Sequence, residues 1–326
     1  VRETFLKRTR IVNAMRATMN EAGYVEVDTP VLQPIPGGAA AKPFITHHNA
    51  LDVDFYMRIA NELYLKRLIV GGFNGVYEFS RNFRNEGMDR THNPEFTIME
   101  LYVAYKDYRW MMGFMEQMLE RVAVAANGSA SATFQANTID FTAPFKRITM
   151  CGALKEKTGK DVLEMDEPSL RSLCAANEIH VEASMGKGKL IDELFSALVQ
   201  PDLIQPTFVC DFPLEMSPLC KKHRDDPRLT ERFELYANGF ELANAYSELN
   251  DPIDQRERFE EQLKLQQRGD DEAMFLDRDF LRALEYGMPP TSGVGIGLDR
   301  LVMLLTNNPA IQEVLLFPQM RPEKFE

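Results

Sequence analysis

Residues 75–103 read GVYEFSRNFRNEGMDRTHNPEFTIMELYV. Polar and apolar side chains alternate with a period of two on both sides of a polar loop at 88–94, which predicts a pair of antiparallel strands. A sheet face that carries an arginine and several carboxylates is costly unless it is solvated or holds a ligand. The apolar face of the first strand carries Tyr77, Phe79 and Phe83, and its polar face carries Glu78, Ser80, Asn82, Arg84 and Glu86, while the second strand places Phe96, Ile98, Glu100 and Tyr102 on one face.

The composition is typical of a globular protein. The chain has 326 residues, of which 44% are hydrophobic and 26% are charged, and its length favours two domains or one large domain with an insertion. No apolar run approaches the roughly 20 residues that a membrane span needs. The four cysteines lack the spacings of a zinc site, so reduced thiols in a cytoplasmic protein are the simplest interpretation. The net charge of −12 argues against non-specific binding of nucleic acid through a basic surface.

Periodicity and breaker residues predict the remaining elements. Residues 31–50 are expected to form a loop, residues 127–131 are the best candidate for a linker, and residues 150–205 are expected to be mostly helical, as an insertion. Helices are predicted at 1–22, 61–70, 108–125, 254–268, 278–286 and 299–305, and strands at 24–27, 54–59, 207–212 and 292–297.

Residues 232–248 predict a hairpin with Asn238-Gly239 as its two-residue turn. This turn would pair position 236 with 241 and position 234 with 243, so that Glu234 and Glu241 become diagonal neighbours. Two carboxylates so close favour a bound cation, and Mg²⁺ with phosphate oxygens as further ligands is the natural candidate. An ordinary solvated acidic face fits the same spacing.

Strict alternation would send Asn244, Tyr246 and Glu248 to the face opposite Glu241. If all four side chains line one pocket, a bulge must lie between Leu242 and Asn244.

Other candidate site residues each have an ordinary alternative. The glycines of 293–297 allow either close packing or close approach of a ligand, and their GxGxG spacing does not match a dinucleotide fingerprint. Arg84 and Glu86 could hold an anion and a cation, or could belong to a surface ladder of ion pairs. Phe96 on a polar face suggests stacking on a planar ligand. His92 could be a solvated loop histidine.

Taken together, these segments resemble a known family. Residues 26–30 (EVDTP), which follow a long helix, resemble motif 1 of the class II aminoacyl-tRNA synthetases. Residues 83–87 (FRNEG) and 92–97 (HNPEFT) resemble motif 2, and residues 295–300 (GIGLDR) resemble motif 3. Within the class, three further segments are similar to lysyl-tRNA synthetases, namely 58–67 (RIANELYLKR), 97–102 (TIMELY) and 244–251 (NAYSELND).

The resemblance implies an α+β fold in which an antiparallel sheet is flanked by helices, with one catalytic domain over residues 1–326 and a helical insertion at about 150–205. It implies a homodimer formed through motif 1. Lysine and ATP would give lysyl-adenylate and pyrophosphate, and the lysyl group would then pass to the acceptor end of tRNA(Lys). Typical members carry a β-barrel anticodon-binding domain before motif 1, so we expect a catalytic core that lacks this domain, forms adenylate and charges tRNA poorly.

The resemblance also implies roles for individual residues. Arg84 would hold the lysine carboxylate and the α-phosphate, and Arg300 the γ-phosphate, so that both stabilise charge during the displacement. Phe96 would stack on adenine. The implied ATP site comprises Arg84, Glu86, His92, Phe96, Glu234 and Arg300, the magnesium ligands are Glu234 and Glu241, and the lysine site comprises Gly38 and Glu62 at the α-amino group, Arg84 and Asn244 at the carboxylate, Glu248 with Tyr102 at the ε-ammonium, and Glu100 on the pocket floor.

Three alternatives remain. A family that attaches β-lysine to elongation factor P has a similar length, although its members tend to lack the loop at 37–39 and to have alanine in place of Gly295. A regulatory paralogue that binds ligand without chemistry would typically have lost some of the site residues. Aspartyl and asparaginyl synthetases share the architecture, but an aspartate pocket needs a cation, whereas Glu248 and Tyr102 would line this one.

Overall fold

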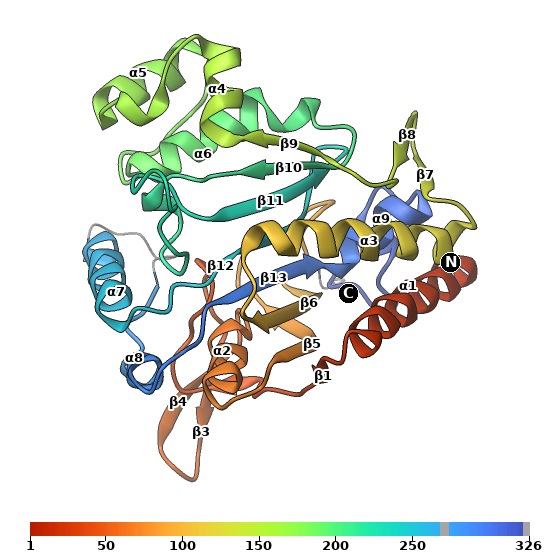
Figure 1. The fold of residues 1–326 in the computed structure, drawn as a ribbon, viewed down its shortest axis with the longest axis horizontal. Helices are drawn as coiled ribbons and strands as arrows, with labels where there is room; N and C mark the ends of the chain where they lie inside the picture. The colour runs from red at the N-terminus through yellow and green to blue at the C-terminus, as the bar shows by residue number, and fades with distance from the viewer. Residues whose placement is uncertain (268–273, 322–326) are drawn as a thin grey trace, which may run out of the picture.

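The fold is built on one eight-stranded sheet, seen in a computed structural model that describes residues 1–267 and 274–321 (Figure 1). The sheet is antiparallel in its centre, and only its two outermost pairings, β1 with β5 and β9 with β10, are parallel. The predicted antiparallel sheet is therefore confirmed, with parallel pairings added at both ends. In spatial order the strands are β1 (Val25–Glu26), β5 (Gly75–Phe83), β6 (Glu95–Ala104), β13 (Thr291–Gly297), β12 (Phe240–Ser247), β11 (Arg232–Ala237), β10 (Thr207–Cys210) and β9 (Lys146–Thr149).

The strand pair predicted from residues 75–103 is β5 and β6. The two strands pair antiparallel, with Glu78 opposite Glu100 and Asn82 opposite Phe96, so the polar face forms as expected. Strand β5 ends at Phe83, however, so Arg84 and Glu86 lie in the following loop rather than on the strand.

One face of the sheet packs against three helices, α1 (Arg2–Glu21), α3 (Tyr108–Asn127) and α9 (Leu298–Thr306). Helix α3 crosses in front of the strands in Figure 1. Its first turn is capped by Asp107, whose carboxylate accepts from the Trp110 N–H at 3.0 Å, and it ends at Gly128, whose φ of 79° suits glycine. Buried methionines at 111, 115 and 118 lie on one side of the helix, which fixes the side that faces the sheet.

The opposite face of the sheet carries helices only at its two ends. Strand β10 is packed on both faces. Phe208 and Cys210 belong to the core under α3, whereas Val209, on the opposite face, belongs to a separate apolar cluster. That second cluster is formed with α4 (Met150–Thr158), α5 (Glu167–Ala176) and α6 (Lys187–Leu198). A third cluster joins β5 and β6 to α2 (Glu62–Val70), α7 (Pro252–Gln267) and α8 (Arg278–Glu285). The middle of this face is therefore left for polar side chains.

Two smaller sheets complete the described chain. One contains β2 (Leu32–Gln33), β3 (Ile45–His48) and β4 (Val53–Met57), and the other is the hairpin of β7 (Ser131–Phe134) and β8 (Asn137–Asp140). The prediction of a loop at 31–50 is wrong at its two ends, where β2 and β3 pair with β4. All four side chains of β3 are exposed, so no alternation of burial marks the strand in the sequence. The predicted residue 268 of the 254–268 helix lies outside the described residues.

The predicted hairpin at 232–248 is β11 and β12. Its turn residues Asn238 and Gly239 have φ values of 51° and 73°, as a two-residue turn of this kind requires. Position 236 faces Glu241 as predicted, but Glu234 faces Asn244 rather than position 243, because the register shifts at an extra residue, Leu242. This β-bulge lies one position before the predicted interval, and it turns Glu241 and Asn244 to the same side of the sheet.

Within residues 1–267 and 274–321, none of the helices combines the length and the apolar content that a bilayer crossing requires.

Candidate active site

A cleft of about 1640 Å³ lies over the polar middle of the sheet, between the two groups of helices. Its floor is formed by side chains of β6, β11, β12 and β13, and its rim includes the loop between β5 and β6 and the start of α6. Glu248 does not reach the cleft surface and is buried directly beneath it. The other predicted site residues all line the cleft, namely Gly38, Glu62, Arg84, Glu86, His92, Phe96, Glu100, Tyr102, Glu234, Glu241, Asn244 and Arg300.

Strand β13 provides a floor with little side-chain bulk, because its glycines alternate on the cleft side. Packing explains Gly293, since a Cβ there would lie 2.1 Å from Glu248 Oε1 and 2.4 Å from Tyr102 Cε1. Gly297 has no comparable contact, because its nearest neighbours would be 3.7 Å away or further. Close packing therefore accounts for Gly293, whereas ligand approach at the other glycines stays a prediction.

Three carboxylates gather at one end of the cleft, and a lysine of the chain lies among them. Glu62 on α2 accepts a hydrogen bond from the fully buried Lys66 at 2.5 Å, and Lys66 also forms an ion pair with Glu248. The Tyr246 hydroxyl donates to the second oxygen of Glu62 at 2.7 Å. Glu100, the third carboxylate, also belongs to this end of the cleft. This part of the site is therefore strongly acidic and almost dry.

Burial sets the protonation of these groups. Removal from water, together with the charge of Glu62, raises the pKa of Glu100 to about 8, although the Tyr102 hydroxyl donates to Glu100 at 3.0 Å. Burial also raises the pKa of Glu248 well above its usual range, and the nearby Lys66 opposes that rise. The two neighbouring carboxylates raise the pKa of Lys66, so its ammonium stays charged despite complete burial.

Gly38 supplies backbone beside this acidic end. Its φ of 87° is one that residues with a side chain rarely adopt, and a Cβ there would lie 3.0 Å from Ala60 Cβ and 3.1 Å from Glu62 Cβ. The structure therefore brings Gly38 and Glu62 together, as the sequence predicts for an α-amino subsite.

The middle and the other end of the cleft are cationic. The guanidinium carbon of Arg84 lies 5.1 Å from the centroid of the Phe96 ring, and the buried Nε of Arg84 has no hydrogen-bond partner. Burial lowers the pKa of Arg84, although its charge is retained because free arginine titrates far above neutral pH. An anion bound here would be attracted by the charge of the guanidinium and could accept a hydrogen bond from its unused Nε–H.

Arg300 and His92 define the far end. Arg300 donates to Nε2 of His92 at 3.1 Å and to the Glu241 carbonyl oxygen at 3.0 Å. Because a guanidinium can only donate, Nε2 must accept, so the proton of the neutral ring lies on Nδ1 and is donated to Asp89 at 2.7 Å. His92 is thus held by contacts on both ring nitrogens and is not a freely solvated loop residue.

Glu234 and Glu241 form the candidate metal pair. One oxygen of Glu234 accepts from Arg232 and the other from the Tyr236 hydroxyl, both at 2.5 Å. Burial raises the pKa of Glu234 to about 7, with Glu241 adding to the rise and Arg232 opposing it. A cation beside the pair would relieve this repulsion, and two carboxylates suit Mg²⁺, which usually takes one or two of them with phosphate oxygens. Among the described residues no group of three or more potential ligand side chains surrounds a single point.

Arg232 is a site residue that the sequence analysis missed. It is buried on β11, where it donates to Glu234, to Asn244 Oδ1 at 3.1 Å and to the Met216 carbonyl oxygen at 2.9 Å. One guanidinium thereby fixes a residue of the candidate metal pair and a residue of the candidate lysine site. Arg232 lies two positions before Glu234 on the strand, and this spacing in the sequence already places the two side chains on the same face.

The sequence of the chain matches the family described as tRNA synthetases class II (D, K and N) over residues 1–321. The chain belongs to this family. The antiparallel sheet, the loop between β5 and β6, and the arginine at the start of α9 are consistent with the three motifs noted in the sequence.

Among the curated relatives of this chain, a lysine–tRNA ligase of Porphyromonas gingivalis (strain W83) is 68% identical over 324 residues, which are 99% of this chain and 56% of the relative. A lysine–tRNA ligase of Christiangramia forsetii is 67% identical over 99% of this chain and 57% of the relative. A lysine–tRNA ligase of Azobacteroides pseudotrichonymphae is 65% identical over the whole chain and 65% of the relative. The chain thus spans between about half and two thirds of the length of these relatives.

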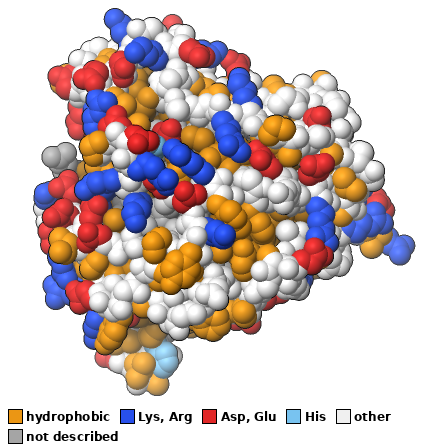
Figure 2. All heavy atoms as spheres, in the orientation of Figure 1, with side chains coloured by type: hydrophobic (Ala, Val, Ile, Leu, Met, Phe, Trp, Pro, Cys, Tyr) orange, Lys and Arg blue, Asp and Glu red, His pale blue; other side chains and the backbone are white. Residues whose placement is uncertain are grey.

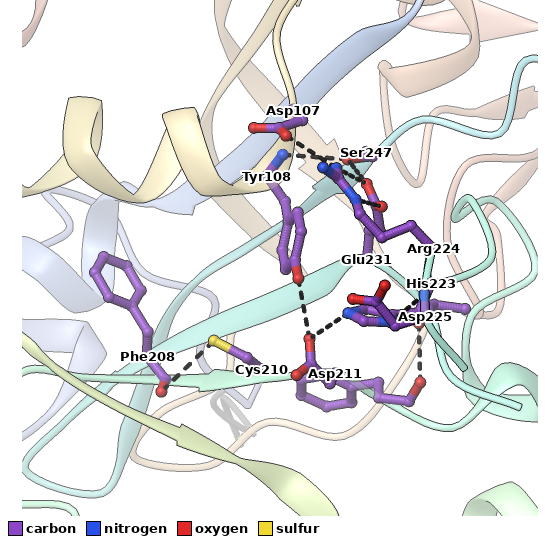
Figure 3. A network of polar contacts seen from close by, with 12 residues as sticks. Asp107, Tyr108, Phe208, Cys210, Asp211, His223, Arg224, Asp225, Glu231 and Ser247 are labelled. Atoms are coloured by element: carbon purple, nitrogen blue, oxygen red, sulfur yellow. Dashed lines mark hydrogen bonds and ion pairs between the residues drawn. The ribbon is translucent and has the colours of Figure 1, made fainter. Parts of the chain in front are cut away.

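A second polar network supports the end of β12, just before Glu248 (Figure 3). Arg224 donates to Glu231 at 2.6 Å and to Asp107 at 2.9 Å, and the Ser247 hydroxyl donates to Glu231 at 2.6 Å. The backbone N–H of Tyr108 completes the network by donating to Ser247 Oγ at 3.1 Å. Burial raises the pKa of Glu231, but these donors outweigh it and hold the pKa below its usual range. The network ties β12 to the first turn of α3.

Proposed function

We propose that this chain is the catalytic core of a lysine–tRNA ligase, which activates L-lysine with ATP and transfers the lysyl group to tRNA(Lys). The observation that carries the proposal is the acidic end of the cleft, where Glu62 and Glu248 lie beside Tyr102 under a glycine floor. A substrate with two ammonium groups suits such a site, because an uncharged isostere would leave two buried carboxyl groups with Lys66 as their one shared cation. The names of the relatives agree with this substrate.

In the proposed reaction the lysine carboxylate attacks the α-phosphorus of ATP, an acyl–phosphate bond forms, and pyrophosphate leaves. The attacking carboxylate is already ionised, so no side chain has to act as a general base. Arg84 binds the carboxylate and the α-phosphate together, and its charge in a water-poor position stabilises the pentavalent transition state. Asn244 orients the same carboxylate, and Arg232 holds the side chain of Asn244 in place.

ATP occupies the cationic end in this proposal. Phe96 stacks on adenine, Glu86 and His92 contact the nucleotide, and Arg300 binds the γ-phosphate. The contact between Arg300 and His92 holds both side chains at the rim in advance of binding.

Mg²⁺ is the proposed cofactor, with Glu234 and Glu241 as its protein ligands. When bound, it would offset the negative charge of the leaving pyrophosphate. Without it, Glu234 is held by Arg232 and Tyr236, so the carboxylate is already oriented toward the cleft.

A homodimer through the motif 1 region is also proposed. Exposed apolar side chains gather on β1 to β4, and Figure 2 shows apolar residues and a histidine at the projecting end of the β3–β4 hairpin. Ile45 is 64% exposed and Leu51 is 62% exposed, which is unusual for side chains that the hydrophobic effect drives from water. In analytical ultracentrifugation, Ile45→Asp should dissociate at a higher protein concentration than the wild-type protein, which serves as the reference.

The function is tested by ATP–pyrophosphate exchange on the purified chain with magnesium and L-lysine, β-lysine or L-aspartate. Exchange that depends on L-lysine is expected. A preference for β-lysine would assign the chain to the ligases that modify elongation factor P. Exchange with aspartate alone would assign it to another branch of the family, and no exchange with any of the three would refute the proposed activity.

A further inference from the structure

Lys66 is the one cation in the acidic end of the cleft among the described residues, and the reaction proposed above does not use it. Its side chain is completely buried on α2 and does not line the cleft. Its ammonium is 2.5 Å from Glu62 Oε1 and in contact with Glu248 Oε2, and it lies 5.4 Å from the centroid of the Tyr246 ring. The chain thus supplies an ammonium group between the two carboxylates that are assigned to the two ammonium groups of the substrate.

The charges at this end of the cleft are unbalanced without substrate. Glu62 and Glu248 share one buried ammonium, Glu100 with its pKa of about 8 holds a proton at neutral pH, and bound L-lysine would add two more ammonium groups. Burial raises the pKa of Glu248, and the nearby Lys66 opposes that rise. The ionisable groups that face this region are Glu62 and Lys66 from α2, Glu78 from β5, Glu100 and Tyr102 from β6, Tyr246 from β12, Glu248 just after it, and Cys220 from the loop before β11, with Arg84 near Glu100 and Arg232 near Cys220.

The contacts of Glu248 leave Oε1 for a ligand. Both oxygens are buried without a hydrogen-bond donor, but Oε2 forms an ion pair with Lys66 and Oε1 has no such contact. Oε1 lies beside Gly293, because a Cβ on that glycine would be 2.1 Å from it, and Gly293 forms part of the cleft floor. A buried acceptor without a donor is costly, and an ammonium that reached it across the glycine floor would remove that cost.

We propose that Lys66 is a positioning residue of the lysine subsite, whose ammonium holds Glu62 and Glu248 in place so that each can bind one ammonium group of the substrate. The inference rests on the proposed function. A salt bridge that served stability alone would not need an oxygen of Glu248 turned, without a donor, toward the cleft floor. Lys66 also offsets the repulsion between the two side chains in a region that excludes water.

The test is the Lys66→Met variant in ATP–pyrophosphate exchange. Without the internal cation, the two carboxyl groups lose the contact that fixes their positions, and the substrate ammonium groups are bound less well. We expect KM for L-lysine to rise at least about tenfold at pH 7 while KM for ATP changes less than about twofold.

Two further variants separate positioning from folding. Lys66→Gln keeps hydrogen-bond donors but removes the charge, so it should raise the lysine KM as Lys66→Met does and provides a second route if the methionine variant does not fold. Ile69→Ala, on the same helix and equally buried, should lower the melting temperature without changing the lysine KM.

Unchanged lysine KM in folded Lys66→Met and Lys66→Gln would overturn the inference and leave Lys66 as a structural ion pair. Absence of lysine-dependent exchange in the wild type would refute the proposed function itself, and the inference with it. The two failures are therefore distinguished by the wild-type measurement.

Discussion

Gly293→Ala should damage the lysine subsite while leaving the ATP end intact. The added methyl would lie 2.1 Å from Glu248 Oε1 and 2.4 Å and 2.7 Å from two atoms of the Tyr102 ring. Ordinary contacts of this kind are about 3.5–4.0 Å, so these groups must move by more than about 1 Å. Both side chains are fully buried, with no empty direction into solvent, so the movement must displace the residues assigned to the ε-ammonium.

The magnitude follows from this displacement. Forcing an extra methyl into a packed region typically costs about 1–3 kcal/mol of folding stability. Each kcal/mol lowers the melting temperature by roughly 2–4 °C in domains of 150–250 residues. A misplacement of about 1 Å can reduce catalytic efficiency about a hundredfold, so we expect kcat/KM for lysine to fall between about tenfold and a hundredfold.

ATP–pyrophosphate exchange as a function of lysine and of ATP concentration measures the effect, and thermal unfolding measures the stability. Gly297→Ala on the same strand is the matched control, because its nearest neighbours would be 3.7–3.9 Å away and its φ is −67°. It should behave nearly as the wild type in both assays. Equal lysine kinetics in Gly293→Ala and Gly297→Ala would show that Glu248 and Tyr102 do not form the subsite.

Three further predictions concern other parts of the cleft and its support. Glu100→Gln should make stability less dependent on pH. The folded protein holds this proton up to about pH 8, whereas the unfolded chain releases it near 4.5, so wild-type stability falls as pH rises through that window, by on the order of 5 kcal/mol in all and about 3 kcal/mol of it between pH 6 and 8. Melting temperatures at pH 6 and 9 that shift equally in both proteins would contradict this. Arg84→Gln should lower lysine-dependent exchange by about 10²–10³-fold with unchanged circular dichroism, and normal exchange would remove Arg84 from the chemistry. Arg8→Met should lower stability by about 3 kcal/mol, because it leaves the buried Asp299 without its 2.7 Å ion pair, whereas the exposed Arg10→Met should change urea unfolding by under about 0.5 kcal/mol.

The polar sheet face could be predicted from the sequence because two local rules agree there. A period of two over residues 75–103 fixes which side chains share a face, but the predicted loop at 88–94 is shorter than the real one, so the pairing of Glu78 with Glu100 did not follow from it. The turn at Asn238-Gly239 could be predicted as directly, since both residues readily adopt the positive φ that such turns require. Local periodicity thus located most of the candidate residues on the correct strands.

Contacts between distant segments could not be predicted in the same way. Lys66 is 182 positions from Glu248, and nothing in the helical pattern of α2 distinguishes it from an ordinary buried or surface lysine. Strand β3 was missed because all of its side chains are exposed, so it lacks the alternation that identifies a strand. Such features depend on which elements meet in space, and that is decided by the whole fold.

The extra residue at Leu242 has a consequence for the kinds of change that this gene could accept. Upstream of Leu242, strand β12 presents Glu241 to the proposed nucleotide end of the cleft, and downstream it presents Asn244 and Tyr246 to the proposed amino-acid end. Deleting any one residue between the turn and Asn244 would rotate one of these sets into the apolar core, whereas replacing Leu242 with another apolar residue would not. We therefore expect this segment to vary in composition among descendants but to keep its length.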